Sequence, residues 1–280
     1  MGRVRTWPVA RRYPGTALST ATSGRRLRDH AAGLAGVVVF VGHPRSGHSL
    51  VGALLDAHPD MVVAHEADLL KYVAAGFRRD QLIALLVRRE RARVAAGHVS
   101  GSGYSYAVPG QWQGRWRRLA VVGDKRGRMT THRLRHRPGL LDELERTVGV
   151  PVKVVQVVRN PYDNVATMHT RAGGEIGTQV ARYTELSATV DAVAGGRDGA
   201  GFHRMYHEDL VADTPAGLAD LCRFLGVDAP ADWLAACDGI VNPSPHRTRD
   251  GVDWTPEARA ALDHLVATTP WLTRYDVTVA

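Results

Sequence analysis

Short apolar runs recur along the chain and predict strands that are buried on both faces. The clearest runs are Val37–Val41 and Pro151–Val158, and shorter ones cover 61–64, 119–122 and 202–206. Apolar runs without polar alternation are typical of parallel sheets that are covered on both sides. Apolar positions at helical spacing predict helices that begin near Ser49 and cover 79–96, 176–194, 215–226 and 256–267. Strands that alternate with helices predict an α/β protein with a doubly wound parallel sheet in a single domain.

The positive charge of the chain is concentrated at its amino end. The 280 residues carry a formal net charge of +8, and residues 1–36 hold seven arginines against one acid, Asp29. This segment has no sustained hydrophobic period and no apolar core of a secretory signal, so we expect a mobile basic tail over 1–36 and one domain over 37–280. The nearly neutral domain predicts no nucleic acid partner. A basic tail that binds RNA, DNA or an anionic membrane stays open as an alternative.

Composition places few other limits on function. Hydrophobic residues make up 44% of the chain and charged residues 23%, as in ordinary globular proteins. No window approaches 18 apolar residues, so we expect no transmembrane segment. Cys222 and Cys237 lie in late helical stretches without metal-ligand spacing. We therefore expect reduced thiols and a cytoplasmic protein.

The turn after the first predicted strand has the composition of an anion-binding loop. Gly42 and Gly47 have the separation found in P-loop NTPases, and Ser49 follows them. His48 stands in place of the lysine of that motif, and the positive charge lies at Arg45 instead. Backbone N–H groups at the start of the next helix have no intrahelical partner, so they attract negative groups. The alternative interpretation is a basic turn between a core strand and a core helix.

Two segments of the chain resemble the sulfotransferases that use 3′-phosphoadenylyl sulfate (PAPS) as donor. Pro44-Arg-Ser-Gly-His-Ser49 is similar to their 5′-phosphosulfate loop. Arg159-Asn-Pro161, with Thr167 eight residues after Arg159, is similar to their Arg-(Asn/Asp)-Pro signature. The resemblance implies that Arg159 and Thr167 bind the 3′-phosphate of PAPS, and that the phosphosulfate is bound by Arg45, Ser46, Gly47, His48 and Ser49. A guanidinium and a hydroxyl suit a phosphate, the first by charge and fork geometry and the second as a neutral donor.

Candidate catalytic residues follow two further predicted strands. Glu66 comes after the run 61–64 and Lys125 after the run 119–122, so both should face the crevice at the carboxyl ends of the strands. Glu66 resembles the glutamate that is assigned as base in tyrosylprotein and several bacterial sulfotransferases, and His65 is the second candidate base. Lys125 resembles the lysine of the family's Gly-(Asp/Glu)-Lys segment, which implies a place near the sulfuryl group. The alternatives are a first-turn helix residue for Glu66, and a solvated turn lysine or a partner of Asp124 for Lys125.

Later segments match the family less closely. His207-Glu-Asp-Leu210 is similar to the family's Tyr-Glu-Asp-Leu segment, whose tyrosine contacts the adenine side of the nucleotide. Because Tyr206 precedes His207, either residue is a candidate for that contact. Arg247 and Arg249 lie in a stretch that loosely resembles the segment folded over the 3′-phosphate in the family. A surface loop is the alternative there.

Two segments have no counterpart in the resemblance. The stretch 101–116 combines turn residues with four aromatic residues and has no regular period. It predicts either a lid over the acceptor pocket or a loop that is held by aromatic packing. The charged run Arg88–Arg93 lies in the predicted helix 79–96, which we expect to be an amphipathic surface helix with this run on its solvated face.

The resemblance implies a sulfotransferase that moves the sulfuryl group of PAPS to a hydroxyl group and releases 3′,5′-ADP (PAP), with PAPS as co-substrate and no metal ion. A hydroxyl-bearing small molecule, glycan, lipid or peptide is the expected acceptor, and the oligomeric state stays open. One alternative is a P-loop kinase or NTPase that uses Mg-ATP, against which the missing lysine counts. The other is a non-catalytic protein that binds nucleic acid or other anions through the basic tail.

Overall fold

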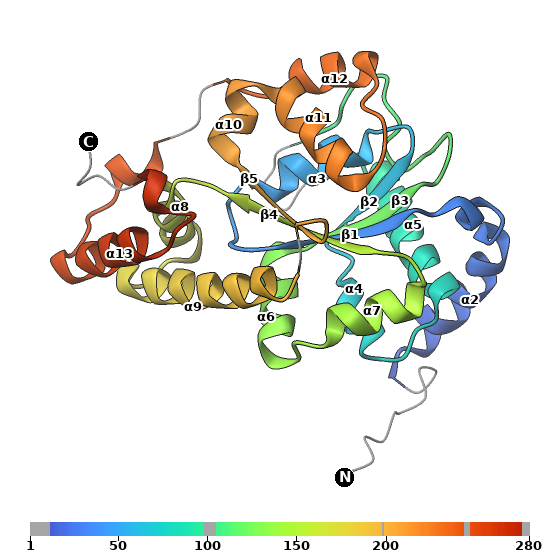
Figure 1. Cartoon of the computed structure of the whole chain (residues 1–280), viewed down its shortest axis with the longest axis horizontal. Coiled ribbons are helices and arrows are strands. Elements are labelled where there is room, and N and C mark those ends of the chain that lie inside the picture. Colours follow the sequence, from blue (N-terminus) through green and yellow to red (C-terminus); the bar gives the residue numbers. More distant parts are fainter. Residues whose placement is uncertain (1–11, 98–104, 198, 244–246, 276–280) are drawn as a thin grey trace, which may run out of the picture.

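Five parallel strands form the centre of the molecule. A computed structural model describes residues 12–97, 105–197, 199–243 and 247–275. The strands are β1 (Gly36–Val41), β2 (Met61–His65), β3 (Val121–Lys125), β4 (Val152–Val158) and β5 (Phe202–Tyr206). They follow the order β2-β3-β1-β4-β5, and all four pairs are parallel (Figure 1). The carboxyl ends of the strands therefore meet at one edge of the sheet.

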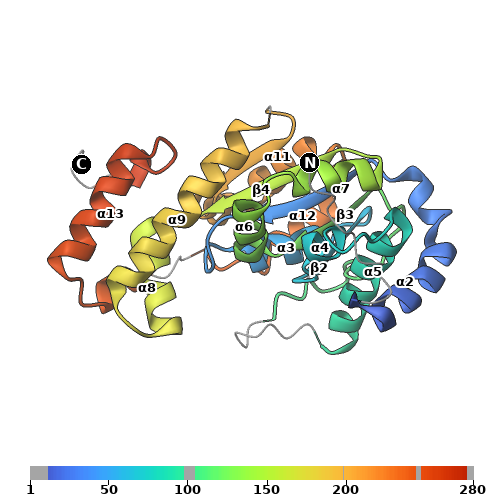
Figure 2. The same cartoon turned by 90° about the horizontal axis from the view of Figure 1, so that it is seen from below.

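Helices cover both faces of this sheet, as the two views in Figures 1 and 2 show. The α-helices are α2 (Pro14–Leu27), α3 (His48–Asp56), α4 (Leu69–Val73), α5 (Arg79–Ala95), α6 (Gly127–His136), α7 (Leu140–Val148), α8 (Pro161–Ala172), α9 (Ile176–Gly195), α10 (His207–Ala212), α11 (Thr214–Leu225), α12 (Ala231–Asp238) and α13 (Pro256–Thr268). Short 3₁₀ turns are η1 (His30–Gly33), η2 (Thr248–Gly251) and η3 (Thr273–Tyr275). Within the described ranges, no helix has the length and apolar character needed to cross a bilayer.

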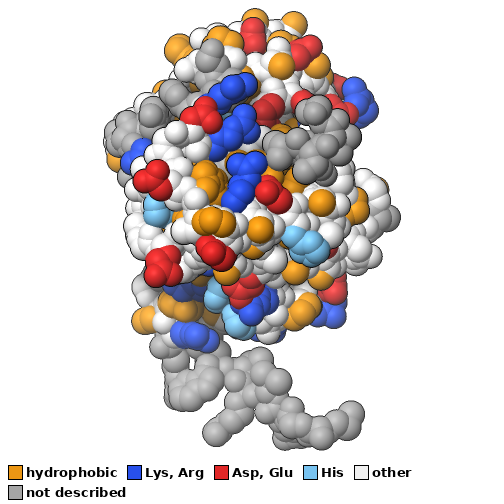
Figure 3. All heavy atoms as spheres, turned by 90° about the vertical axis from the view of Figure 1, so that its left-hand side faces the viewer, with side chains coloured by type: hydrophobic (Ala, Val, Ile, Leu, Met, Phe, Trp, Pro, Cys, Tyr) orange, Lys and Arg blue, Asp and Glu red, His pale blue; other side chains and the backbone are white. Residues whose placement is uncertain are grey.

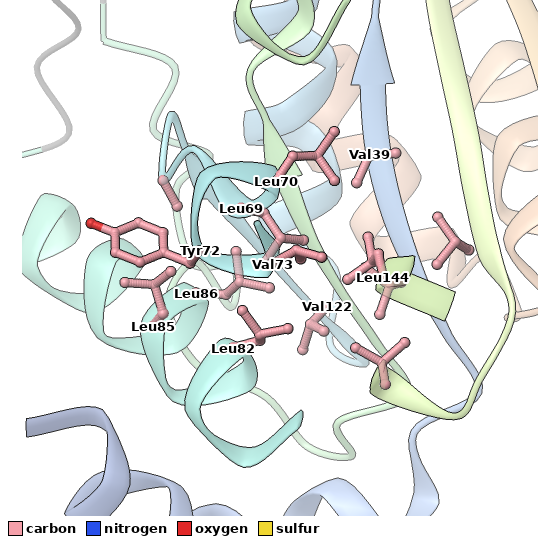
Figure 4. Packing of buried hydrophobic residues seen from close by; sticks show 14 of the residues in the cluster. Val39, Leu69, Leu70, Tyr72, Val73, Leu82, Leu85, Leu86, Val122 and Leu144 are labelled. Atoms are coloured by element: carbon pink, nitrogen blue, oxygen red, sulfur yellow. The ribbon is translucent and has the colours of Figure 1, made fainter. Parts of the chain in front are cut away.

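Alternate residues of β1 belong to two separate cores. Val37, Val39 and Val41 pack in a core with residues of α4, α5 and α7, part of which is drawn in Figure 4. Val38 and Phe40 pack in a second core with residues of α3, α11 and α12. Because successive side chains of a strand point to opposite faces, an unbroken apolar run fills both cores. The predicted doubly wound parallel sheet is thus confirmed.

The segment predicted as a mobile tail is largely helical. Helix α2 packs on α5, where a Cβ atom at Gly24 would lie only 2.6 Å from the carbonyl oxygen of Asp80. Ala17 and Thr20 are buried on the same side of α2. The prediction of a mobile tail over 1–36 is therefore wrong for residues 14–33, and residues 1–11 lie outside the described residues. Small residues allow the close approach of two helices without producing a hydrophobic period in the sequence.

Helix α5 is more deeply buried than its sequence suggested. All its residues from Gln81 to Val87 are buried, because β2 and β3 cover one side and α2 another. Glu90, in the run Arg88–Arg93 that was predicted to be solvated, is 0% exposed. Arg88 and Arg89 are exposed as predicted, so the prediction fails at Glu90.

The carboxyl groups of Glu90 and Asp56 accept hydrogen bonds from backbone N–H groups on the outer edge of strand β2. The backbone N–H of His65 donates to Glu90 Oε2 at 2.9 Å, and that of Val63 donates to Asp56 Oδ1 at 3.0 Å. Arg93 contacts Glu90 at 2.5 Å. Burial, reinforced by the nearby Glu90 carboxylate, raises the pKa of Asp56 well above its usual range. The edge N–H groups of β2 are thus satisfied inside the protein and not by a further strand.

The described part of the aromatic segment, 105–116, is held against the amino end of β2. Trp112 donates its backbone N–H to Ala57 O at 3.2 Å, and Gly114 donates to Asp56 Oδ2 at 3.0 Å. The side chain of Gln113 bonds to the backbone of Tyr106 and Val108. These contacts agree with a loop held by packing and place it away from the carboxyl ends of the strands. Residues 101–104, the rest of the segment that was predicted as a lid or a packed loop, lie outside the described residues.

The Glu90→Ala substitution should lower the free energy of unfolding by about 3–5 kcal/mol, because it removes the buried acceptor of the His65 N–H and the carboxylate that lies 2.5 Å from the Arg93 guanidinium. Asp80→Ala, on the same helix, is the matched control. Asp80 pairs with the exposed Arg28, so its loss should cost about 1 kcal/mol or less. Urea unfolding followed by circular dichroism measures both values. Equal losses for the two variants would contradict the structural role of Glu90.

Candidate active site

The loop between β1 and α3 has the backbone of an anion site. Gly42 and Gly47 have φ angles of 121° and 104°, and Arg45 has a φ of 68°, in the left-handed region. The N–H of Gly42 donates to Thr131 Oγ1 at 2.8 Å, which fixes the entry of the loop. The first N–H groups of α3 have no partner within the helix and point outward from its amino end. Arg45, in the same loop, is exposed.

Two side chains of this loop turn into the protein. The predicted donor-binding residues Ser46 and His48 are 0% and 7% exposed. Ser46 Oγ donates to His43 O at 3.0 Å, and His48 Nε2 lies 3.0 Å from Val41 O. Burial, with a smaller effect of the Lys125 charge, lowers the pKa of His48 to about 3. The neutral ring of His48 therefore supplies no charge to the crevice, and only backbone groups of Ser46 and His48 are positioned to meet a ligand.

Lys125, at the end of β3, lies under the start of helix α3. Its side chain is 4% exposed, and its Nζ donates to Ser49 Oγ and to Glu66 Oε1, both at 3.1 Å. A Cβ atom at Gly52 would lie 2.6 Å from Lys125 Cγ, so only glycine leaves a path for this side chain. Burial lowers the pKa of Lys125, and the Glu66 carboxylate opposes this effect. Lys125 thus lies at the carboxyl end of β3 with its side chain enclosed, and its carboxylate partner is Glu66, not Asp124.

Glu66 and His65 offer two proton acceptors next to the Lys125 ammonium. The Glu66 side chain is 52% exposed, and His65 Nε2 lies 3.4 Å from Lys125 Nζ. Although partial burial acts in the other direction, the Lys125 charge and hydrogen bond hold the pKa of Glu66 below its ordinary value. Burial, followed by the Lys125 charge, lowers the pKa of His65 to about 4. At neutral pH the site thus contains a carboxylate and a neutral imidazole.

A strained turn presents Glu66. Glu66 and Asp68 have φ angles of 59° and 64°, which non-glycine residues rarely adopt. Asp124, which the sequence analysis considered only as a partner of Lys125, accepts the N–H groups of Ala67 and Leu69 at 2.8 and 2.7 Å. Burial raises the pKa of Asp124 to about 6. Asp124 therefore holds the turn at 66–68, and the next residue, Lys125, contacts the Glu66 side chain that this turn presents.

Arg159 and Thr167 lie together at the start of α8. Arg159 Nη1 donates to Thr167 Oγ1 at 3.2 Å and to the backbone oxygen of Arg45 at 3.4 Å. The side chain of Asn160 caps the helix by accepting the N–H of Tyr162. The two segments that carry the resemblance are 114 residues apart in sequence, and the structure joins them directly.

The segment around η2 extends this second cluster. Thr248 Oγ1 lies 2.9 Å from Thr167 Oγ1, and Thr248 was not a candidate from the sequence. The backbone N–H of Arg249 donates to Asp163 Oδ1 at 3.0 Å, and its guanidinium lies 3.7 Å from the same carboxylate. Arg247 is exposed next to η2. A threonine has no distinguishing pattern in sequence, so only the packing of η2 on α8 reveals Thr248.

His207, and not Tyr206, lies against the glycine loop. A Cβ atom at Gly47 would lie 2.7 Å from His207 Nδ1, and this nitrogen is buried without a hydrogen-bond partner. Tyr206 turns away, because its hydroxyl donates to Trp271 O at 3.1 Å. Burial lowers the pKa of His207. Since an N–H enclosed without an acceptor is costly, the proton of the neutral ring belongs on Nε2.

The site therefore combines two cationic clusters, one with Arg45 and Lys125 and the other with Arg159 and Arg249, at one edge of the sheet. Two proton acceptors, Glu66 and His65, lie at the same edge. Figure 3 views the side of the molecule that lies on the left in Figure 1, where Lys and Arg side chains form a stripe between patches of acidic side chains. Among the residues that the structure describes, no three His, Cys, Asp or Glu side chains are grouped to hold a metal ion. Such an arrangement suits a ligand that carries two separate anionic groups.

No protein-family model and no curated protein sequence matches this chain. Its structure is similar to solved sulfotransferase structures. The sulfotransferase domain from the curacin biosynthetic pathway is 16% identical, and the match covers 83% of this chain and 98% of that domain with a TM-score of 0.51. The domain from the Synechococcus olefin synthase is 17% identical over 82% and 86% of the two chains, with a TM-score of 0.49. A Mycobacterium tuberculosis sulfotransferase is 16% identical over 88% and 83%, with a TM-score of 0.49. The first likeness shows that this chain has the fold of a sulfotransferase domain, which confirms the predicted P-loop-like fold.

A buried histidine of the loop should make the protein sensitive to acid. His43 stacks on Tyr183 with ring centroids 3.7 Å apart, and burial lowers its pKa from 6.5 to about 3. Between these pH values the unfolded chain binds a proton that the folded protein excludes, so stability falls as pH falls. Relative to a His43→Phe variant, the wild type should lose about 2 kcal/mol of unfolding free energy between pH 7 and pH 5.

Urea unfolding of both proteins at several pH values measures this difference. The control is His264→Gln, which changes an exposed histidine and should leave the pH dependence of the wild type intact. Parallel curves for the wild type and the His43→Phe variant would contradict a neutral buried His43.

Proposed function

We propose that this protein is a sulfotransferase that moves the sulfuryl group of PAPS to a hydroxyl acceptor and releases 3′,5′-ADP. The observation that carries the proposal is the contact between the Arg45 loop and Arg159, which places two cationic clusters side by side. PAPS is a nucleotide with anionic groups on both sides of its ribose, at the 5′ and the 3′ positions. The fold supports the same conclusion.

The donor would be held at both ends. The exposed Arg45 guanidinium and the first N–H groups of α3 would bind the 5′-phosphosulfate. Arg159, Thr167 and Thr248 would bind the 3′-phosphate, with Arg249 nearby. His207 would present its Nε2–H to the nucleotide from the side opposite the enclosed Nδ1. Arg247 remains a further candidate for the 3′-phosphate because of its exposed position.

Lys125 would stabilise the leaving group. During transfer the acceptor oxygen forms a bond to sulfur, the bond from sulfur to the bridging oxygen breaks, and negative charge grows on that oxygen. An ammonium group at the base of the crevice, fixed by Ser49 and Glu66 at 3.1 Å each, is preorganised to meet this charge. Because the site holds it in place before the reaction, little reorganisation is needed in the transition state.

Glu66 would remove the proton from the acceptor hydroxyl. It is ionised at neutral pH, half exposed to the crevice, and held in a fixed position by the turn at 66–68. His65 is the second candidate, because its ring is neutral and its Nε2 lies 3.4 Å from the Lys125 ammonium group. The strain at Glu66 favours the carboxylate, since a positive φ at a non-glycine residue persists only where the surroundings enforce it.

Ligand-induced stabilisation tests the donor directly. PAP should raise the melting temperature more than 5′-AMP, ADP or ATP, because only PAP carries phosphates at both the 5′ and the 3′ position. At a concentration one-hundredfold above its dissociation constant, PAP should add about 2.7 kcal/mol to the stability. Each nucleotide is tested with EDTA and with Mg²⁺. A larger shift from ATP with Mg²⁺ than from PAP would favour the kinase alternative and contradict the proposal.

Transfer of labelled sulfate from PAPS separates the roles of the residues. Glu66→Gln should lower kcat by about 100-fold or more, since the amide cannot accept the proton. Arg45→Ala should abolish measurable transfer, whereas Arg159→Ala should mainly raise the KM for PAPS. Arg223→Ala, at an exposed site on α11, is the control and should match the wild type. Full activity of the Glu66→Gln variant together with an inactive His65→Ala variant would transfer the role of base to His65.

A further inference from the structure

A second concentration of positive charge lies on the side of the molecule formed by α2 and α5. Residues 12–28 and 78–95 hold ten arginines and two acids, a net charge of +8 that equals the charge of the whole chain. The other 245 residues are therefore neutral overall. Figures 1 and 2 both show α2 and α5 side by side at one end of the molecule, with α8 and α13 at the other. Helix α2 is thus far from α8, which carries Thr167 of the proposed donor site.

Helix α2 presents one stripe of its surface to the outside. Leu18, Thr22, Arg25 and Arg26 are all exposed and follow one another at helical spacing. The opposite stripe, Ala17, Thr20 and Gly24, is buried against α5. Leu18 is 74% exposed and is the one large hydrophobic side chain with this exposure among the described residues. We define the basic face as the outer stripe of α2 together with the exposed Arg88 and Arg89 of α5.

The arginines of the basic face are not used within the fold. The ion pairs on this side join Arg28 to Asp80 and Arg93 to Glu90, and none within the described ranges involves Arg25, Arg26, Arg88 or Arg89. On α5, Arg88 and Arg91 are spaced i,i+3, and like charges at this spacing destabilise a helix. The fold therefore bears a cost here that an anionic partner would remove.

We infer that the basic face is a docking surface for an anionic membrane. Exposed arginines would attract negatively charged lipid headgroups, and Leu18 would enter the boundary between headgroups and acyl chains. The outer stripe belongs to a helix that lies along the outside of the molecule, which suits a flat partner. An isolated exposed leucine does not fit a nucleic acid partner, because proteins recognise nucleic acids through contacts to phosphates and base edges. This inference does not depend on the proposed reaction.

Co-sedimentation of the full-length protein with lipid vesicles tests the inference. Binding is expected to vesicles that contain phosphatidylglycerol and not to vesicles of phosphatidylcholine alone, and it should weaken as salt is added. Arg25→Gln combined with Arg26→Gln should lower the partition coefficient about 30-fold. Arg146→Gln combined with Arg223→Gln removes two exposed arginines elsewhere and is the matched control. Circular dichroism of each variant establishes that the fold is intact.

Two results would overturn the assignment. One is equal binding of the protein to neutral and anionic vesicles, or no binding to either at low salt. The other is tight, salt-sensitive binding to duplex DNA or RNA that Leu18→Ser leaves unchanged while the Arg25 and Arg26 variant loses it, which would make the basic face a nucleic acid site. Weaker vesicle binding by Leu18→Ser, with the arginines intact, would support the membrane.

Discussion

The buried ammonium group of Lys125 is the constraint on which the geometry of the crevice depends. An ammonium can be enclosed at this position only if anionic or polar partners replace the water that it loses. Its partners come from the first turn of α3 and from the end of β2, through Ser49 and Glu66. One charge therefore fixes three elements relative to one another at the carboxyl ends of the strands. Gly52 makes this possible by leaving space for the lysine chain beneath α3.

Backbone strain is concentrated at the same edge of the sheet. The non-glycine residues with positive φ in the described part of the chain are Arg45, Glu66 and Asp68. Arg45 lies in the loop after β1, and the turn at 66–68 follows β2 and is held by Asp124 and by the pair of Arg133 with Asp68. Strained residues of this kind persist where surrounding contacts enforce them and are frequent in functional sites. The strain supports the location of the site by an argument that is independent of any motif.

The cationic side chains of the candidate site and those of the basic face differ in how they are held. At the crevice, Lys125 and Arg159 are held by defined contacts, Lys125 by Ser49 and Glu66 and Arg159 by Thr167 and the backbone of Arg45. On the basic face, arginines are exposed, and no ion pair within the described part of the chain involves Arg25, Arg26, Arg88 or Arg89. A held cation suits a single ligand in one orientation, whereas loosely distributed cations suit an extended anionic surface. Helix α2 lies at the end of the molecule opposite α8 and α13, so a partner bound to its outer stripe would leave the Arg159 cluster open.

The amino-acid sequence by itself determined the strands, their parallel arrangement and the two segments that meet at the crevice, because apolar runs, capping residues and short motifs are local signals. Arg45, Arg159 and Thr167 were chosen as candidates in this way, as were Glu66 and Lys125 at the ends of strands. Only the tertiary structure decided that His48 is neutral, since its pKa depends on enclosure near Val41 and Lys125.

The same holds for Glu90, which is buried because Arg93 and the N–H of His65 surround it, and for the amino-terminal helix α2, whose buried stripe consists of small residues with no hydrophobic period. The general reason is that burial, and the pKa shifts that follow from it, depend on residues that are distant in sequence, and no local pattern contains that information.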